Sequence, residues 1–194
     1  MDNSSNSGNK ILWLIAAIVV IGGIYTYMRS GEMPKSAEQG RMTFFVTSKN
    51  PGQGADLGGL SGADKYCQSL ATAAGVSSNT WRAYLSATAL GKEPVIDARD
   101  RIGKGPWHNY KGVLIAANVE DLHSKNMISK ETALTEKGEV VNGRGDNPNI
   151  HDILTGSNPK GTASTTGTTC SNWTSSGEGS AIVGHHDRIG LNES

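Results

Sequence analysis

The segment near the C-terminus that reads Gly184-His185-His186-Asp187-Arg188 holds the residue types best suited to metal chemistry. Side chains alternate along a strand, so His185 and Asp187 share one face there and His186 points to the other. Imidazole and carboxylate groups are common ligands of zinc. We therefore take His185, His186 and Asp187 as candidate zinc ligands.

A zinc ion at this segment needs further ligands, which the sequence does not identify. The remaining histidines are His108, His123 and His151. The chain has neither His-Glu-x-x-His nor Cys-x-x-Cys, spacings that bring two ligands together on one element. A structural network of hydrogen bonds and ion pairs is the alternative, and the sequence favours it because scattered histidines rarely converge.

A second polar segment, from Asp146 to Asp152, contains the turn Asn147-Pro148-Asn149. Calcium takes six to eight oxygen ligands, several of them from carboxylates, and this segment supplies few. Its alternative role is a turn whose side chains bond their own backbone. Trp107 is either an exposed aromatic anchor for a sugar or partner, or a core residue. The candidate binding residues are Trp107, Asp146, Asn147, Asn149 and Asp152.

Nucleophilic catalysis has little support in the sequence. The segment Gly177-Glu178-Gly179-Ser180 does not match the Gly-x-Ser-x-Gly elbow of hydrolases. We therefore expect that the protein is not an enzyme, and we assign no catalytic residue.

The elements that would position these residues are short. Ser61-Gly62-Ala63-Asp64 resembles a capping box and predicts a helix that continues to about Ala74 and ends at Gly75, with Cys67 on its buried face. Alternation and β-branched or aromatic content predict strands or short apolar elements elsewhere. These segments are 42–47, 81–85, 113–117, 150–154, 168–173 and 181–185, with a helical turn at 119–123.

The chain has only two cysteines, Cys67 and Cys170. An even pair in a Gly-rich domain is typical of a disulfide in an oxidising compartment, and two unrelated free thiols are the alternative. The pair therefore favours a location outside the cytoplasm.

Residues 11–28 form one apolar run. A helix over it would be roughly 27 Å long, close to the thickness of a hydrocarbon core. The run predicts a single transmembrane helix between a disordered tail at 1–10 and a linker at 29–40, followed by one domain at 41–194. The basic residues Arg29, Lys35 and Arg41 after the run favour a cytoplasmic domain, against the cysteines. We expect a single-pass inner-membrane protein whose domain lies in the periplasm or outside.

Composition limits the partners. The chain carries 18 basic and 18 acidic residues, so it lacks the basic surface of a nucleic-acid-binding protein. Its 25 glycines predict a loop-rich domain.

The order of these motifs resembles the C-type-lectin-like fold, in particular bacterial extracytoplasmic domains, and more distantly the endostatin-type domain. The resemblance covers about 41–188. It is carried by Phe45-Val46-Thr47-Ser48, Leu57-Gly58-Gly59-Leu60-Ser61-Gly62-Ala63-Asp64-Lys65-Tyr66-Cys67, Trp81-Arg82-Ala83-Tyr84-Leu85-Ser86 and Cys170-Ser171-Asn172-Trp173-Thr174.

The resemblance implies a loop-rich lectin-like domain in which Cys67 and Cys170 form a disulfide. With the apolar run, the expected class is α+β: a transmembrane helix followed by this domain. The resemblance also implies a non-catalytic domain that binds proteins, glycans or other surfaces. Together with the apolar run, it predicts a domain that binds a protein partner, as an accessory or structural subunit of a membrane complex. There are two alternatives. One is a glycan-binding lectin, with calcium as its cofactor, and the other is a zinc-binding domain. The lectin triplet Trp-Asn-Asp is missing, because the chain has Asn172-Trp173-Thr174.

Overall fold

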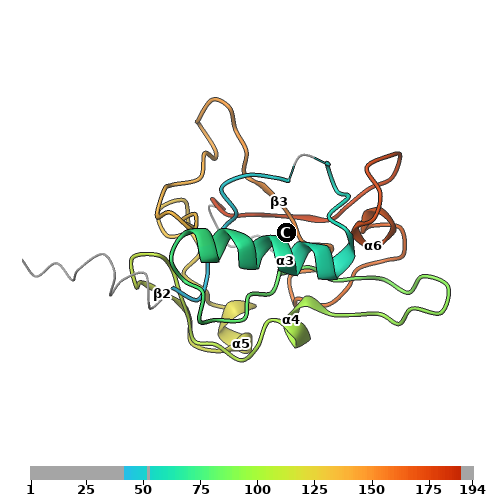
Figure 1. Ribbon diagram of the computed structural model, residues 1–194, viewed down its shortest axis with the longest axis horizontal. Helices are drawn as coiled ribbons and strands as arrows, with labels where there is room; N and C mark the ends of the chain where they lie inside the picture. The colour runs from blue at the N-terminus through green and yellow to red at the C-terminus, as the bar shows by residue number, and fades with distance from the viewer. Residues whose placement is uncertain (1–41, 52, 189–194) are drawn as a thin grey trace, which may run out of the picture. The chain divides into compact units, whose positions relative to one another are not determined.

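The computed structural model describes residues 42–51 and 53–188, which all belong to one compact unit, Ser36–Ser194. The described part is a small mixed α/β structure in which long irregular segments join short elements (Figure 1). The elements in chain order are α3 (Gly59–Ala73), α4 (Ala98–Arg101), β1 (Trp107–His108), β2 (Leu114–Ala116), α5 (Val119–Leu122), β3 (Asp152–Leu154), α6 (Cys170–Trp173) and β4 (Val183–His185). Within this part of the chain, β1 pairs with β2 and β3 pairs with β4, both antiparallel.

The helix predicted to end at Gly75 is confirmed as α3, and it begins earlier than expected. Its N-cap is Gly58, in the left-handed conformation with φ of 72°, and no side chain caps it. The predicted capping box is therefore wrong. The carboxylate of Asp64 instead accepts a hydrogen bond from the Ala83 backbone N–H, 2.8 Å away. Asp64 thus connects α3 to the neighbouring extended segment.

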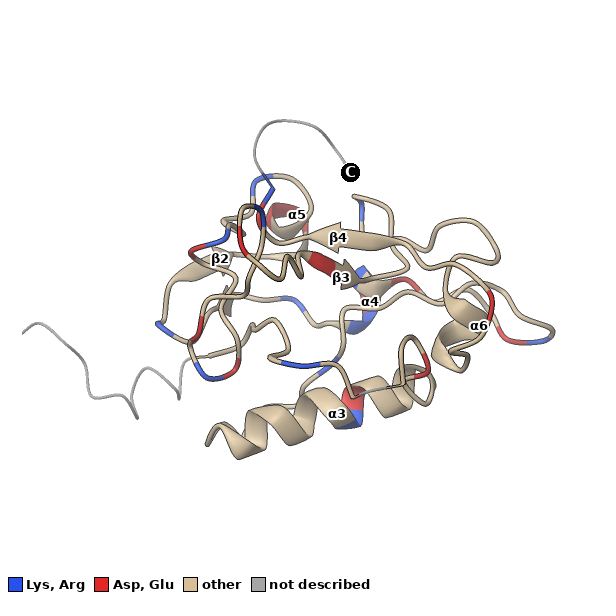
Figure 2. Cartoon of the chain, turned by 90° about the horizontal axis from the view of Figure 1, so that it is seen from above, with Lys and Arg blue, Asp and Glu red and all other residues tan. Residues whose placement is uncertain are grey.

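Two groups of apolar residues hold α3 in place. One group includes Met42, Ala71 and Trp81, and the other includes Trp173 and Ala63. Leu154 of β3 packs against the second group. In Figure 2, α3 runs along one side of the unit and the β3–β4 pair along the other, with irregular segments between them. Ile153, on the opposite face of β3, packs against the buried residues Val46, Ala133 and Val141, so both faces of this strand contact apolar groups.

The predicted short elements had mixed outcomes. Strands form within 113–117, 150–154 and 181–185, and the helical turn at 119–123 is confirmed as α5. Segments 42–47 and 81–85 are not strands: Val46 forms a single bridge, with Thr135, and 81–85 forms none. Their apolar side chains pack into the core, but their backbones meet no continuous partner strand. Residues with high β-propensity favour extended, half-buried positions, whether or not the backbone pairs with another strand.

The predicted strand 168–173 is also wrong, because α6 occupies it. All four of its residues have positive φ, from 44° to 68°. L-residues adopt this left-handed conformation at a cost. Buried hydrogen bonds to another segment compensate for this cost. Asn172 Nδ2 donates to the Thr88 carbonyl at 2.9 Å, and the Trp173 indole donates to the Ser86 carbonyl at 2.8 Å.

The expected membrane architecture needs correction. No helix within 42–51 and 53–188 is both long enough and apolar enough to cross a membrane. The run 11–28, on which the transmembrane prediction rests, lies outside the described residues, as do the tail 1–10 and the linker 29–40. We therefore do not retain the fold class with a membrane helix, the single-pass description or the inner-membrane location.

The expected disulfide is corrected as well, because Cys67 and Cys170 are both free thiols. Cys67 packs between the two apolar groups beside α3, where burial raises the pKa of its thiol to about 11. The Cys170 Sγ contacts the Ser180 carbonyl, 3.4 Å away.

Candidate metal centre

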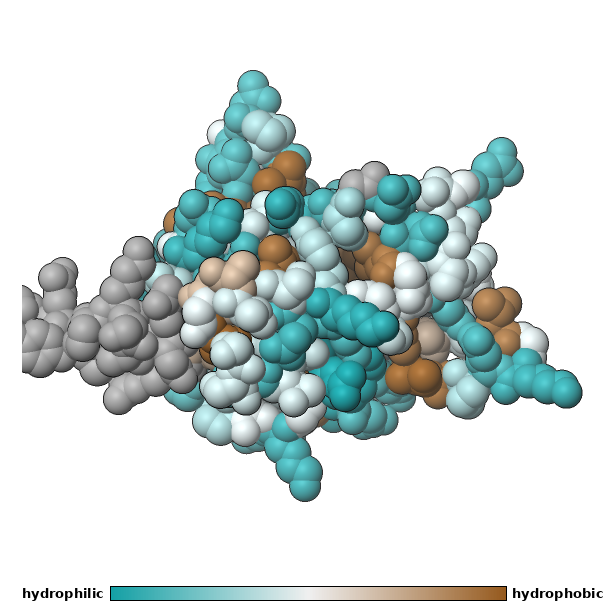
Figure 3. All heavy atoms as spheres, viewed as in Figure 1, coloured by the Kyte–Doolittle hydropathy of each residue, from teal (hydrophilic) through white to brown (hydrophobic). Residues whose placement is uncertain are grey.

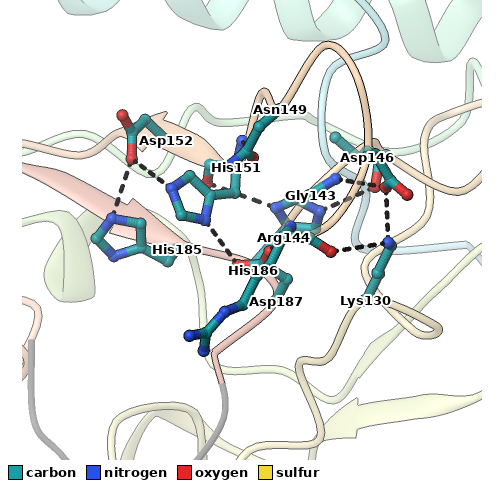
Figure 4. A network of polar contacts seen from close by, with 11 residues as sticks. Lys130, Gly143, Arg144, Asp146, Asn149, His151, Asp152, His185, His186 and Asp187 are labelled. Atoms are coloured by element: carbon teal, nitrogen blue, oxygen red, sulfur yellow. Dashed lines mark hydrogen bonds and ion pairs between the residues drawn. The ribbon is translucent and has the colours of Figure 1, made fainter.

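A cluster of two histidines and a carboxylate lies at one end of the β3–β4 pair (Figure 4). The register places Asp152 of β3 opposite His185 of β4. Residues paired in this way project from the same face of the sheet. Asp152 Oδ1 lies 2.9 Å from His185 Nε2 and 3.4 Å from Nε2 of His151, the residue that precedes β3.

These three ligand atoms lie close enough together that they could hold a metal ion. Each of the three residues offers one atom, and these atoms all lie within 4.8 Å of one another. Zinc–ligand bonds of about 2.0–2.1 Å imply ligand atoms roughly 3.3 Å apart in a tetrahedral site. The two distances from Asp152 lie near this value. The two imidazole rings meet edge to face, with centroids 4.7 Å apart.

A fourth residue, Asp187, orients one of the histidines. Its Oδ1 accepts a hydrogen bond from His151 Nδ1 at 3.1 Å, and its Oδ2 accepts one from the Arg144 backbone N–H. Because Nδ1 carries the proton in this bond, Nε2 of a neutral His151 is free to bind a metal. Burial would raise the pKa of Asp187, but the bonds from Arg144 and His151 outweigh it, and this pKa is lowered. Carboxylate–histidine–metal arrangements of this kind are typical of zinc sites.

The predicted ligand set is therefore only partly brought together. His185 belongs to the cluster, and Asp187 reaches it only through His151. The His186 side chain turns away: it is 3% exposed, and Nε2 donates to the Val141 carbonyl at 3.1 Å. The alternation expected from the sequence predicted this separation of His185 from His186.

Asp152 was expected in a calcium or glycan loop and instead joins the histidines. Asp146 accepts bonds from Lys130 Nζ at 2.6 Å and from the Gly143 N–H at 2.8 Å. The bond from Lys130 is the main cause that lowers the pKa of Asp146. Among the described residues, Asp146 belongs to no group of three potential metal ligands. Its contacts are those of a turn that binds its own neighbours.

The other candidate binding residues have separate surroundings. Asn149 Oδ1 accepts a bond from the His151 N–H at 3.3 Å, and Asn147 is exposed. Trp107 is 8% exposed and packs with Ile115 and Ala116. It is a core residue in this structure, which was one of the two alternatives.

Solvent reaches the cluster. The side chains of His151 and His185 are 30% and 33% exposed, and that of Asp152 is 62% exposed. A metal held here by three protein ligands has an open coordination position, as in catalytic rather than structural zinc sites.

A second histidine contact was not foreseen from the sequence. The Tyr84 hydroxyl lies 2.8 Å from His123 Nε2, and Nδ1 donates to the Val119 carbonyl at 2.6 Å. The hydroxyl is therefore the donor to Nε2. Burial raises the pKa of Tyr84 to about 12 and lowers the pKa of His123. These residues lie on separate segments, and no local pattern in the sequence links them.

The fold and the site together define a small mixed α/β domain with a solvent-accessible histidine–carboxylate cluster. The chain matches no protein-family model, and no curated protein matches it either. The function is therefore argued from the site alone.

Proposed function

We propose that this protein binds a divalent transition metal, zinc in particular, through His151, Asp152 and His185. The observation that carries the proposal is the convergence of their ligand atoms within 4.8 Å of one another. Two imidazoles and one carboxylate form a ligand set used by zinc enzymes and zinc-binding proteins. Calcium is less suited to the site, because it prefers oxygen ligands only.

The buried carboxylate of Asp187 gives independent support. Its side chain is 4% exposed and is hydrogen-bonded to His151 on the side away from Asp152. A metal-binding histidine needs such a partner to fix its tautomer and ring orientation. An arrangement that served only as a surface ion pair would not need this second carboxylate.

The competing explanation is a metal-free network. In that case Asp152 accepts hydrogen bonds from the two histidines, and no ion is bound. The two explanations differ in a measurable way, because only the first predicts stoichiometric metal uptake.

The test is zinc binding by the full-length protein after its metal has been removed with a chelator. Calorimetry against a competing chelator should give one zinc ion per chain. The His185→Ala and His151→Ala variants should each bind at least roughly 100-fold more weakly, since each removes a direct ligand. His108→Ala is the matched control, because His108 lies on β1 and outside the cluster. Negligible uptake, or equal affinity in His185→Ala, would refute the proposal.

The other functions expected from the sequence keep the status of predictions. A protein-binding role as an accessory or structural subunit and the lectin resemblance are not tested by any observation on the described residues, nor is the expectation that the protein is not an enzyme. On the face seen in Figure 3, the surface is mostly hydrophilic and the apolar residues form separate small groups. Glycan binding at Trp107 has no support in this structure, because Trp107 is buried.

A further inference from the structure

A cavity of about 630 Å³ lies between α3 and the β3–β4 pair. Its wall includes Ala63 and Tyr66 of α3, Leu85, Leu154 of β3 and Val183 of β4. This volume lies in the range of small-molecule sites, which are mostly apolar with a few polar groups. The cavity therefore has the size of a binding site for a small organic molecule, and its lining also contains polar and charged residues such as Arg82, His123 and Arg188.

Two of the three proposed metal ligands, Asp152 and His185, also line this cavity. The strand register explains why. Asp152 pairs with His185 and Leu154 pairs with Val183, so the four side chains lie on one face of the two-stranded sheet. Leu154 packs against the apolar group of Ala63, Leu85 and Trp173, so this face is the one turned towards α3. Ile153, on the opposite face, packs against a different buried group.

The polar cluster lies at the outer end of this wall. Asp152 is 62% exposed, whereas Leu154, roughly 7 Å further along the strand, is partly buried against the core. A ligand bound here would thus meet the metal site first and apolar side chains deeper in the cavity.

The open coordination position determines the chemistry of the head group. A metal with three protein ligands takes its fourth from water or from a ligand, and anionic oxygen donors replace this water readily. We infer that the metal held by His151, Asp152 and His185 coordinates the carboxylate of an amphipathic organic acid whose apolar part occupies the cavity. This inference rests on the metal binding proposed above.

The test uses cobalt as a spectroscopic substitute for zinc in the full-length protein. Cobalt is added to the metal-free protein first, and a visible absorption band reports its binding at the site. Acetate or octanoate is then titrated into the cobalt-loaded protein, and octanoate into the metal-free protein. The two acids share a head group and differ only in chain length.

We expect both acids to shift the cobalt band and octanoate to bind at least roughly 30-fold more tightly than acetate, because each fully buried methylene contributes about fourfold in affinity. Octanoate should bind the metal-free protein at least roughly tenfold more weakly than the loaded protein. In Val183→Phe, whose larger side chain enters the cavity, the preference for octanoate over acetate should fall.

The outcomes separate the two proposals. If no cobalt band appears, the metal-binding proposal itself fails. If cobalt binds but neither acid shifts its band, metal binding stands and the present inference is refuted. Equal affinities of acetate and octanoate would refute the role of the cavity. Equal binding of octanoate with and without cobalt would refute coordination of its carboxylate.

Discussion

Oδ1 of Asp187 lies 3.1 Å from Nδ1 of His151, and this hydrogen bond holds Nε2 of the same ring towards Asp152 and His185 (Figure 4). Asp187 follows β4 by two residues, whereas His151 immediately precedes β3. The antiparallel pairing of β3 with β4 brings the two together. The orientation of the proposed metal ligand thus depends on a residue that does not touch the metal.

The first prediction follows from this contact. In Asp187→Asn the charge that favours the Nδ1-protonated form of His151 is lost, so zinc affinity should fall about 10- to 100-fold. Competition calorimetry on protein whose folding is verified by circular dichroism measures the change. Asp146→Asn is the matched control, since this carboxylate bonds Lys130 and Gly143 and not a histidine of the cluster. An Asp187→Asn protein with unchanged affinity would show that Asp187 has only a structural role.

The second prediction concerns the pH dependence of stability. Burial lowers the pKa of His123 below its ordinary 6.5, so the unfolded chain binds a proton more readily than the native protein. The free energy of unfolding should therefore fall as the pH drops from 7 through 6.5, until the pH passes below the native pKa of His123. Urea unfolding at several pH values should show a smaller fall in His123→Gln than in the unmodified protein. The other histidines are common to both proteins, so an identical pH dependence would contradict the assignment.

The third prediction concerns the thiols. At pH 8 the half-buried Cys67 is protonated, because its pKa is about 11, and it should react slowly with a disulfide reagent in the native protein. Cys170 should react faster. Both thiols should react rapidly in denaturant without added reductant. Mass spectrometry after alkylation identifies each site. If neither thiol reacts in denaturant until reductant is added, a disulfide is present. The description of both cysteines as free thiols is then wrong.

The fourth prediction concerns the buried carboxylate of Asp64, which bonds Arg82 and Arg101 at 2.8 Å each and the Ala83 N–H. Asp64→Ala leaves the Arg101 charge, 14% exposed, without this partner. It should therefore reduce the free energy of unfolding by about 3–5 kcal/mol.

The matched control for Asp64 is Arg82→Ala. The Arg82 side chain is 50% exposed, so its loss should cost about 1 kcal/mol or less. Urea unfolding measures both variants. Equal costs would mean that burial does not set the strength of this ion pair.

The sequence alone determined the local features that depend on nearby residues. Gly75, with φ of 87°, ends α3 where the pattern predicted a helix end. The strands within 150–154 and 181–185 were predicted as short segments bounded by turn-forming residues, and the opposite orientation of His185 and His186 was predicted from alternation. Local backbone preference and side-chain periodicity suffice for such features.

The tertiary structure decided which residues meet. Asp152 was assigned from sequence to a calcium loop and His185 to a zinc site, with His151 as one of three possible further ligands. The β3–β4 register combines the three and places Asp187 behind His151. The tertiary structure also decided that segments 42–47 and 81–85 lack partner strands and that both cysteines are free thiols. The reason is physical: register, pairing and burial arise from contacts between segments far apart in the chain, and no local pattern specifies them.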